Sequence, residues 1–118
     1  MQRGRNWCFT INNPTEEDWN DVRSLKTTYW IVGKEVGENF TPHLQGYCRF
    51  KNSRTLSAVK KKLRRAHLEV AKGTFDQNIA YCSKDGDYEE EGIRPKVGRP
   101  SEQERIERNK LLVTINFT

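Results

Sequence analysis

The stretch His43-Leu44-Gln45-Gly46-Tyr47-Cys48-Arg49-Phe50 predicts a β-strand around which the other elements of the chain can be placed. Successive side chains of a strand point to opposite faces of a sheet. Leu44 is therefore expected to face the core, while His43 and Gln45 share the other face. The residues before this strand, 33–42, predict the end of an earlier strand followed by a polar loop.

Segments on both sides of this strand alternate between strand and helix patterns. In the first predicted helix, Trp19, Val22 and Leu25 recur at helical spacing, and Thr15 is expected to cap the helix. The predicted strands cover 7–11, 29–32, 43–50 and 67–70, and the predicted helices cover 15–26, 54–65 and 75–84.

This order of elements predicts the fold class. It indicates an α+β fold, an antiparallel sheet of about five strands with split βαβ (ferredoxin- or RRM-like) topology and helices packed on one face. The other face would stay open for a ligand. Because the same topology serves unrelated proteins, it does not name a function.

The composition is that of one small basic domain. The 118 residues are 34% hydrophobic, with 21 Lys and Arg against 16 Asp and Glu, which gives a net charge of +5. A basic balance permits a polyanionic partner without proving one. The three cysteines are widely spaced and form no CxxC pair, so neither a zinc cluster nor a disulfide framework is expected. No apolar run is long enough for a signal peptide or a membrane span, and we expect a soluble, non-secreted protein.

His43 and Gln45, side by side on one strand face, could hold two coordination positions of a divalent ion. Glu35 could add a carboxylate if its strand pairs with the strand of His43 as a hairpin. One nitrogen with oxygen donors suits Mg²⁺ or Mn²⁺ better than zinc. Taken alone, however, the pattern favours a plainer interpretation, in which His43 and Gln45 are ordinary exposed side chains of a strand.

The third predicted helix carries a candidate nucleophile. Tyr81, Lys84 and Asp85 are spaced so that they can share one helical face. A phenol attacks a phosphodiester poorly near neutral pH, so it needs a cation that polarises the phosphate and an ammonium that neutralises the developing charge. In the alternative interpretation, Tyr81 packs against the sheet with its hydroxyl in water.

A one-sided run of basic side chains extends from Lys51 to Lys72, where the only acid is Glu69. A solvated helix face normally mixes charges of both signs, so this run favours phosphate binding. Trp7, Phe9 and Tyr47 could stack on bases, although at least one of the three is expected in the core. The cations predicted to contact DNA are Arg5, Lys60, Lys61, Lys62, Arg64 and Lys72.

Three segments, taken in order, resemble the motifs of a known family. They are Cys8-Phe9-Thr10-Ile11-Asn12-Asn13-Pro14, Pro42-His43-Leu44-Gln45-Gly46-Tyr47 and Tyr81-Cys82-Ser83-Lys84. Over about residues 6–90 the chain resembles the N-terminal endonuclease domain of Rep proteins, the rolling-circle replication initiators of circovirus- and nanovirus-like circular single-stranded DNA viruses. These belong to the HUH endonucleases, named for two histidines flanking a hydrophobic residue. Gln45 stands at the second histidine position, as in the circovirus-like branch.

The resemblance implies a metal site. Glu35, His43 and Gln45 would bind the divalent ion, Mn²⁺ or Mg²⁺. Asp85 would add a further contact. Glu38 competes with Glu35 for the carboxylate role, because the loop that separates Glu38 from His43 is short.

The resemblance also implies a transesterification. Tyr81 would be the nucleophile and Lys84 would neutralise phosphate charge, while Asn12 and Asn13 would lie near the DNA-binding face. The domain would nick the exposed loop of an origin stem-loop in single-stranded DNA and keep the 5′ end on Tyr81. The same bond would later be used to ligate the completed circle.

The resemblance further suggests a location and a domain arrangement. We expect the host cell nucleus as the location, no membrane partner and an isolated domain that is monomeric. Residues 1–90 would form the endonuclease domain, and 91–118 a linker or tail toward a helicase domain. No GxxxxGK[ST] loop occurs in these residues, so ATP would act only through that helicase.

Two other functions compete with the nuclease. A non-catalytic RRM-like module would bind single-stranded nucleic acid through paired aromatic residues in a Lys/Arg-Gly-Phe-x-Phe pattern. The strand at 43–50 lacks that pattern. A plasmid or mobile-element relative of the same nuclease would share the chemistry and differ only in its host.

Overall fold

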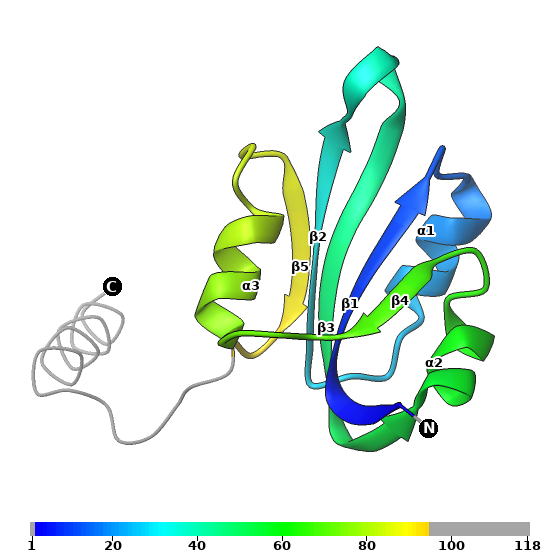
Figure 1. The fold of residues 1–118 in the computed structure, drawn as a ribbon, viewed down its shortest axis with the longest axis vertical. Coiled ribbons are helices and arrows are strands. Elements are labelled where there is room, and N and C mark those ends of the chain that lie inside the picture. The colour runs from blue at the N-terminus through cyan, green and yellow to red at the C-terminus, as the bar shows by residue number, and fades with distance from the viewer. Residues whose placement is uncertain (1, 95–118) are drawn as a thin grey trace, which may run out of the picture.

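A computed structural model describes residues 2–94 of the chain, and Met1 and residues 95–118 lie outside the described range. The predicted linker at 91–118 therefore falls almost wholly outside it. In chain order the elements are β1 (Arg3–Asn12), α1 (Glu16–Arg23), β2 (Tyr29–Val36), the 3-10 turn η1 (Glu38–Phe40), β3 (Pro42–Thr55), α2 (Leu56–Lys62), β4 (His67–Val70), α3 (Phe75–Cys82) and β5 (Tyr88–Gly92) (Figure 1). None of the helices in the described range is long and apolar enough to cross a membrane.

The strands form one antiparallel sheet in the order β4-β1-β3-β2-β5. Its first four strands have the split βαβ arrangement that the sequence predicts, so the predicted fold class is confirmed. The helices are shorter than predicted, and β1 and β3 are longer. β5 was not among the predicted strands, because its run from Glu89 to Glu91 is charged and carries no apolar pattern. Its backbone pairs with β2 all the same.

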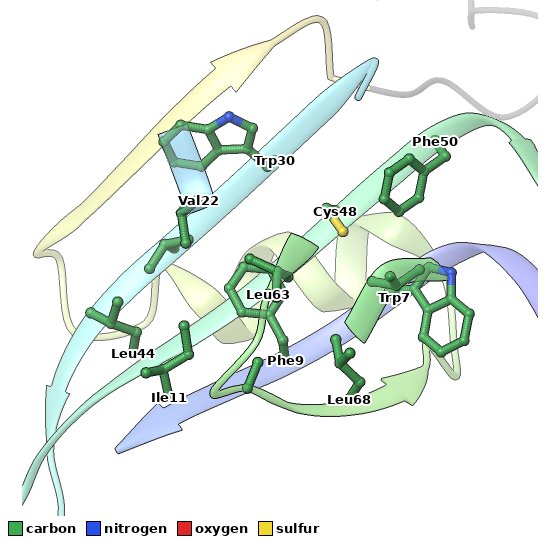
Figure 2. Packing of buried hydrophobic residues seen from close by; sticks show 13 residues of the cluster. Trp7, Phe9, Ile11, Val22, Trp30, Leu44, Cys48, Phe50, Leu63 and Leu68 are labelled. Atoms are coloured by element: carbon green, nitrogen blue, oxygen red, sulfur yellow. The ribbon is translucent and has the colours of Figure 1, made fainter. Parts of the chain in front are cut away.

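One face of the sheet, covered by α1 and α2, holds the main core. Trp7, Phe9 and Ile11 alternate along β1, and each is at most 1% exposed. Figure 2 shows them clustered with Leu44 of β3 and with Leu63, which follows α2. Fully burying a large apolar side chain contributes about 1.5–3 kcal/mol, so burial in this cluster stabilises the fold. The predicted core orientation of Leu44 is confirmed.

The opposite face carries α3, so the expectation that all helices lie on one face is wrong. Figure 1 shows α3 apart from α1 and α2. Ile79 and Cys82, three residues apart on α3, are buried against Tyr47 of β3 and the start of β2. The four residues of β2 from Tyr29 to Val32 are all buried. Such a continuous apolar run is typical of a strand that is covered on both faces, and it is the sequence signal for this second layer.

The turn between β1 and α1 is held by a buried carboxylate. Asp18 is 2% exposed and accepts hydrogen bonds from the Thr15 backbone N–H at 2.8 Å and the Thr15 hydroxyl at 3.1 Å. Arg65 pairs with the same carboxylate and donates to the backbone carbonyls of Asn12 at 3.1 Å and Asn13 at 3.5 Å. This network fixes the chain where β1 ends beside β3.

Candidate active site on the second face of the sheet

The three predicted metal ligands lie on adjacent strands of the sheet face that carries α3. Glu35 of β2 pairs in register with His43 of β3, and Gln45 follows two residues later. The distance from Glu35 Oε1 to His43 Nε2 is 3.2 Å. The Glu35 side chain is only 9% exposed, so its carboxylate is held within the site.

The sequence offers two further carboxylates, Glu38 in place of Glu35 and Asp85 as an additional ligand. Glu38 is exposed in η1, and the structure brings Glu35 to His43 instead. Asp85 is exposed in the turn after α3. Within residues 2–94, no hydrogen bond or ion pair joins Asp85 to the three predicted ligands.

Lys84 links the Glu35 carboxylate to the candidate nucleophile. Its Nζ atom pairs with Glu35 Oε2 and lies 3.9 Å from the centre of the Tyr81 ring. Although partial burial opposes the effect, the hydrogen bond and charge of Glu35 raise the pKa of the Lys84 ammonium. Because α3 ends at Cys82, Lys84 reaches the site from the following turn rather than from the predicted helical face.

Tyr81 lines a cleft of about 320 Å³ whose other walls come from β1, β3, β4 and the loop before α3. It is 54% exposed, so the alternative in which it packs against the sheet does not hold. Gln45 lines the same cleft, together with Thr10 and Asn78. The cleft therefore presents the phenol and one predicted metal ligand to the same space.

A glycine on β2 allows α3 to approach the sheet closely. At Gly33, a Cβ atom would stand 2.0 Å from the backbone oxygen of Cys82. The start of α3 is fixed by a capping box. Thr74 Oγ1 accepts from the Gln77 N–H at 3.2 Å, and Gln77 Oε1 accepts from the Thr74 N–H at 3.0 Å. Local sequence thus sets where α3 begins, and Gly33 sets how near its end lies to the ligands.

Several polar residues of the cleft were not predicted as functional, among them Thr10, Asn78 and Cys8. Thr10 of β1 donates to Gln45 Oε1 at 3.2 Å. Asn78 of α3 accepts from the Cys8 thiol at 3.0 Å. Burial, reinforced by the charge of Glu69, raises the pKa of that thiol. Strand alternation is the signal that could have found Thr10 and Cys8, because both occupy the positions of β1 that alternate with core residues.

Trp7 and Phe9, predicted to stack on bases, are core residues, so that prediction is wrong. They are 0% and 1% exposed, because the odd-numbered positions of β1 from Trp7 to Ile11 face α1 and α2. Tyr47, the third aromatic considered, lies on the α3 face but is 1% exposed, and its hydroxyl donates to Asn6 Oδ1 at 2.7 Å. None of the three therefore offers an exposed ring to a base.

Most of the predicted DNA-contacting cations lie away from the cleft. Lys60, Lys61 and Lys62 belong to α2, which covers the main core on the other face of the sheet. Lys60 donates to a backbone carbonyl of the following loop. Arg64 pairs with Asp21 at 3.1 Å. The structure thus does not bring these four residues to Tyr81.

The other predicted DNA contacts lie in the cleft and at the two ends of β1. Lys72 lines the cleft itself. Asn12 and Asn13 are exposed at the end of β1, where Asn12 pairs in register with His43. Arg5, near the start of β1, is exposed and donates to a backbone carbonyl of β3 at 3.3 Å.

The chemistry of the donor set fits a hard divalent cation. A carboxylate oxygen, an amide oxygen and an imidazole nitrogen suit Mg²⁺ or Mn²⁺. Within residues 2–94, no group of three or more His, Cys, Asp and Glu side chains could hold a metal ion. Gln45 would therefore have to supply the third donor. Glu35 already contacts the Lys84 ammonium and the His43 imidazole, so the site is one that attracts positive charge.

Residues 4–85 match the family model described as "Putative viral replication protein". The chain is 58% identical over 86 residues to a replication-associated protein of Beak and feather disease virus, an alignment that covers 70% of this chain and 30% of the relative. It is 44% identical over 90 residues to that of Porcine circovirus 1, covering 72% and 29%. A replication-associated protein of Human associated cyclovirus 1 is 40% identical over 107 residues, covering 86% and 38%. The chain thus spans about a third of the length of these relatives.

Proposed function

The chain belongs to the family of putative viral replication proteins, and from this membership we propose that it acts in viral DNA replication as the origin-nicking endonuclease of a rolling-circle initiator. The proposed reaction is a transesterification on single-stranded DNA. It leaves the 5′ end of the cut strand joined to Tyr81 as a phosphotyrosine and releases a free 3′-hydroxyl.

The observation that carries this proposal is the arrangement around Lys84. The ammonium stands between the Tyr81 ring, 3.9 Å from Nζ, and the Glu35 carboxylate. Tyr81 is exposed in the same cleft that Gln45 lines. A phosphodiester at Tyr81 would share the cleft with Gln45, and the Lys84 ammonium beside the Tyr81 ring is paired with Glu35. A nucleophile, a positive charge and cation ligands are the parts that phosphoryl transfer needs.

The bond changes in the proposed step balance without a co-reactant. The Tyr81 oxygen attacks phosphorus and forms the new P–O bond, while the bond from phosphorus to the 3′-oxygen breaks. The proton leaves the phenol, and the departing 3′-oxygen gains one. Lys84 neutralises the charge that builds on the phosphate oxygens. Because one phosphodiester replaces another, attack by a 3′-hydroxyl on the phosphotyrosine reverses the step and ligates the strand.

Glu35, His43 and Gln45 are the residues that would hold the divalent cation. When bound, such an ion supplies Lewis-acid polarisation of the phosphate. Glu35 and His43 face each other at 3.2 Å across two paired strands, so the sheet itself sets their separation. We propose that the bound cation is Mn²⁺ or Mg²⁺.

The proposal extends to partner and location. The substrate is a stem-loop in single-stranded viral DNA, and the reaction takes place in the host cell nucleus. The isolated domain acts as a monomer, with ATP used only by a helicase domain outside these residues. The relatives are about three times longer than the stretch they share with this chain, which leaves room for such a domain.

The test is formation of a covalent adduct. The protein is incubated with Mn²⁺ and 3′-labelled stem-loop oligonucleotides whose loops are randomised, and the product is run on a denaturing gel. We expect a labelled protein band with the wild type and none with Tyr81→Phe or His43→Ala. Tyr88→Phe is the matched control, because Tyr88 is a partly exposed tyrosine on β5. It should form the adduct at the wild-type rate. An adduct that survives Tyr81→Phe would refute the assigned nucleophile.

The RRM-like binding module is less well supported. That function needs exposed aromatic residues on the central strands. On β1 and β3, Trp7, Phe9 and Tyr47 are all buried. Binding of the oligonucleotides without any adduct, over a range of Mn²⁺ concentrations, would favour this module instead.

A further inference from the structure

We propose that Thr10 is a positioning residue that holds the side-chain amide of Gln45 so that its oxygen can bind the divalent cation. This inference rests on the metal site proposed above and adds a residue to it. Thr10 would touch neither the cation nor the DNA phosphate, and would act only through Gln45.

The two predicted ligands on β3 are each held by a different neighbouring strand. His43 is held from β2, where Glu35 Oε1 lies 3.2 Å from its Nε2. Gln45 is held from β1, where Thr10 pairs with it in register and the Thr10 hydroxyl lies 3.2 Å from Gln45 Oε1. On the β2 side, the residue paired with Gln45 is Gly33, which has no side chain to offer. Within residues 2–94, the hydrogen bond that the Gln45 side chain makes is the one from Thr10.

A glutamine ligand needs such a contact more than a histidine does. Its side chain has several free torsions, and ordering it costs up to about 2 kcal/mol of conformational entropy. Threonine is β-branched and its first side-chain torsion is restricted, so its hydroxyl occupies a defined place on the strand. An amide oxygen has two lone pairs. It can accept from the Thr10 hydroxyl with one of them and keep the other for a cation.

The position of Thr10 separates this role from a purely structural one. Thr10 is half-buried and lines the cleft that Gln45 and Tyr81 also line. It belongs to neither cluster of buried hydrophobic residues. Valine has nearly the same shape as threonine, so Thr10→Val removes the hydroxyl with little change in packing volume.

The experiment measures Mn²⁺ affinity directly, by isothermal titration calorimetry on the full 118-residue chain at low temperature. We expect Thr10→Val to weaken Mn²⁺ binding by about tenfold, as loss of an orienting hydrogen bond to a metal ligand typically does. Thr10→Ser keeps the hydroxyl and should bind within about threefold of the wild type. Thr28→Val is the matched control, because the Thr28 hydroxyl, just before β2, donates to the Arg49 carbonyl at 2.9 Å. It should bind Mn²⁺ as the wild type does.

The outcomes separate this inference from the proposed function. If Thr10→Val binds Mn²⁺ as tightly as the wild type while His43→Ala does not, the metal site stands and the role of Thr10 is refuted. If His43→Ala binds as tightly as the wild type, the metal site itself is wrong, and the role of Thr10 falls with it. Unfolding of Thr10→Val is followed in parallel. Should it be less stable, the rise in its Tm on adding Mn²⁺ replaces calorimetry, and a rise equal to that of Thr10→Ser would also refute the inference.

Discussion

Gly33→Ala tests whether the close seating of α3 on β2 places Tyr81 and Lys84 at the site. An alanine Cβ would stand 2.0 Å from the Cys82 backbone oxygen and 3.1 Å from its carbonyl carbon. Ordinary contact begins at 3.4 Å. The obstructing atoms belong to backbone, so they cannot swing aside as the end of a flexible side chain would.

The magnitude follows from that overlap. The end of α3 must retreat by roughly 1.4 Å to restore ordinary contact, and such overpacking costs about 1–3 kcal/mol of stability. A displacement of about 1 Å at a reacting group can lower the rate by about a hundredfold. Glu35, His43 and Gln45 are on the sheet and not on α3. We therefore expect Mn²⁺ affinity to fall by less than the roughly tenfold that the loss of a contact to a ligand costs.

The assay combines urea denaturation, Mn²⁺ titration and the rate of adduct formation, the last measured well below the unfolding temperature. Gly4→Ala is the matched control, because the nearest neighbour of its Cβ would be a side-chain methyl of Val70, at 3.2 Å, and the nearest backbone atom would be 4.0 Å away. It should keep the wild-type adduct rate. If Gly33→Ala forms the adduct at the wild-type rate with unchanged stability, the close approach of α3 does not position Tyr81.

Three further predictions follow from other contacts. Asp18→Ala removes a buried acceptor of two Thr15 hydrogen bonds and should lower the free energy of unfolding by about 2 kcal/mol in urea titrations. Asp21→Ala, which breaks only the exposed pair with Arg64, should cost less than about 1 kcal/mol. The hydrogen bond from Arg94, together with that from Tyr29, holds the pKa of the Glu90 carboxyl below its usual 4.5. The ionised Glu90 therefore stabilises the fold above pH 4.5, and this stabilisation is lost as the pH falls below that value. Glu90→Gln should flatten this acid limb of the stability curve, whereas Glu91→Gln should leave it unchanged. Lys72 lies in the cleft, and Lys72→Ala should reduce the slope of the logarithm of the binding constant for single-stranded DNA against log salt by about 0.7. The double variant Lys61→Ala with Lys62→Ala, on the other face, should change that slope less. The reverse order would place the DNA on α2.

Local signals in the sequence determined the elements and the motifs. Thr15 was predicted to cap the first helix, and the structure shows its capping box. The short strand predicted at 67–70 is β4 with the same bounds. Strand alternation correctly separated Leu44 from His43 and Gln45. These features depend on neighbours within a few residues, which is why a single sequence contains them.

The site was predicted in part. His43 and Glu35 were paired on the assumption of a hairpin, and the register of β2 and β3 confirms that they meet. Thr10 was not predicted, because its contact with Gln45 joins residues 35 positions apart on strands that are not consecutive. Lys84 was placed on a helical face that the chain does not form there, since α3 ends at Cys82.

Only the tertiary structure decided which side of each strand meets which helix. The period of a strand tells which residues share a face, but it does not tell what covers that face. α3 could have packed beside α1 and α2. Instead, Gly33 and the buried end of α3 seat it on the second face, where Tyr81 lies with Gln45. Trp7 and Phe9 are buried on the other face, beneath α1 and α2. The basic helix α2 therefore lies on the opposite side of the sheet from Tyr81, because one sheet has only two faces to divide among its helices.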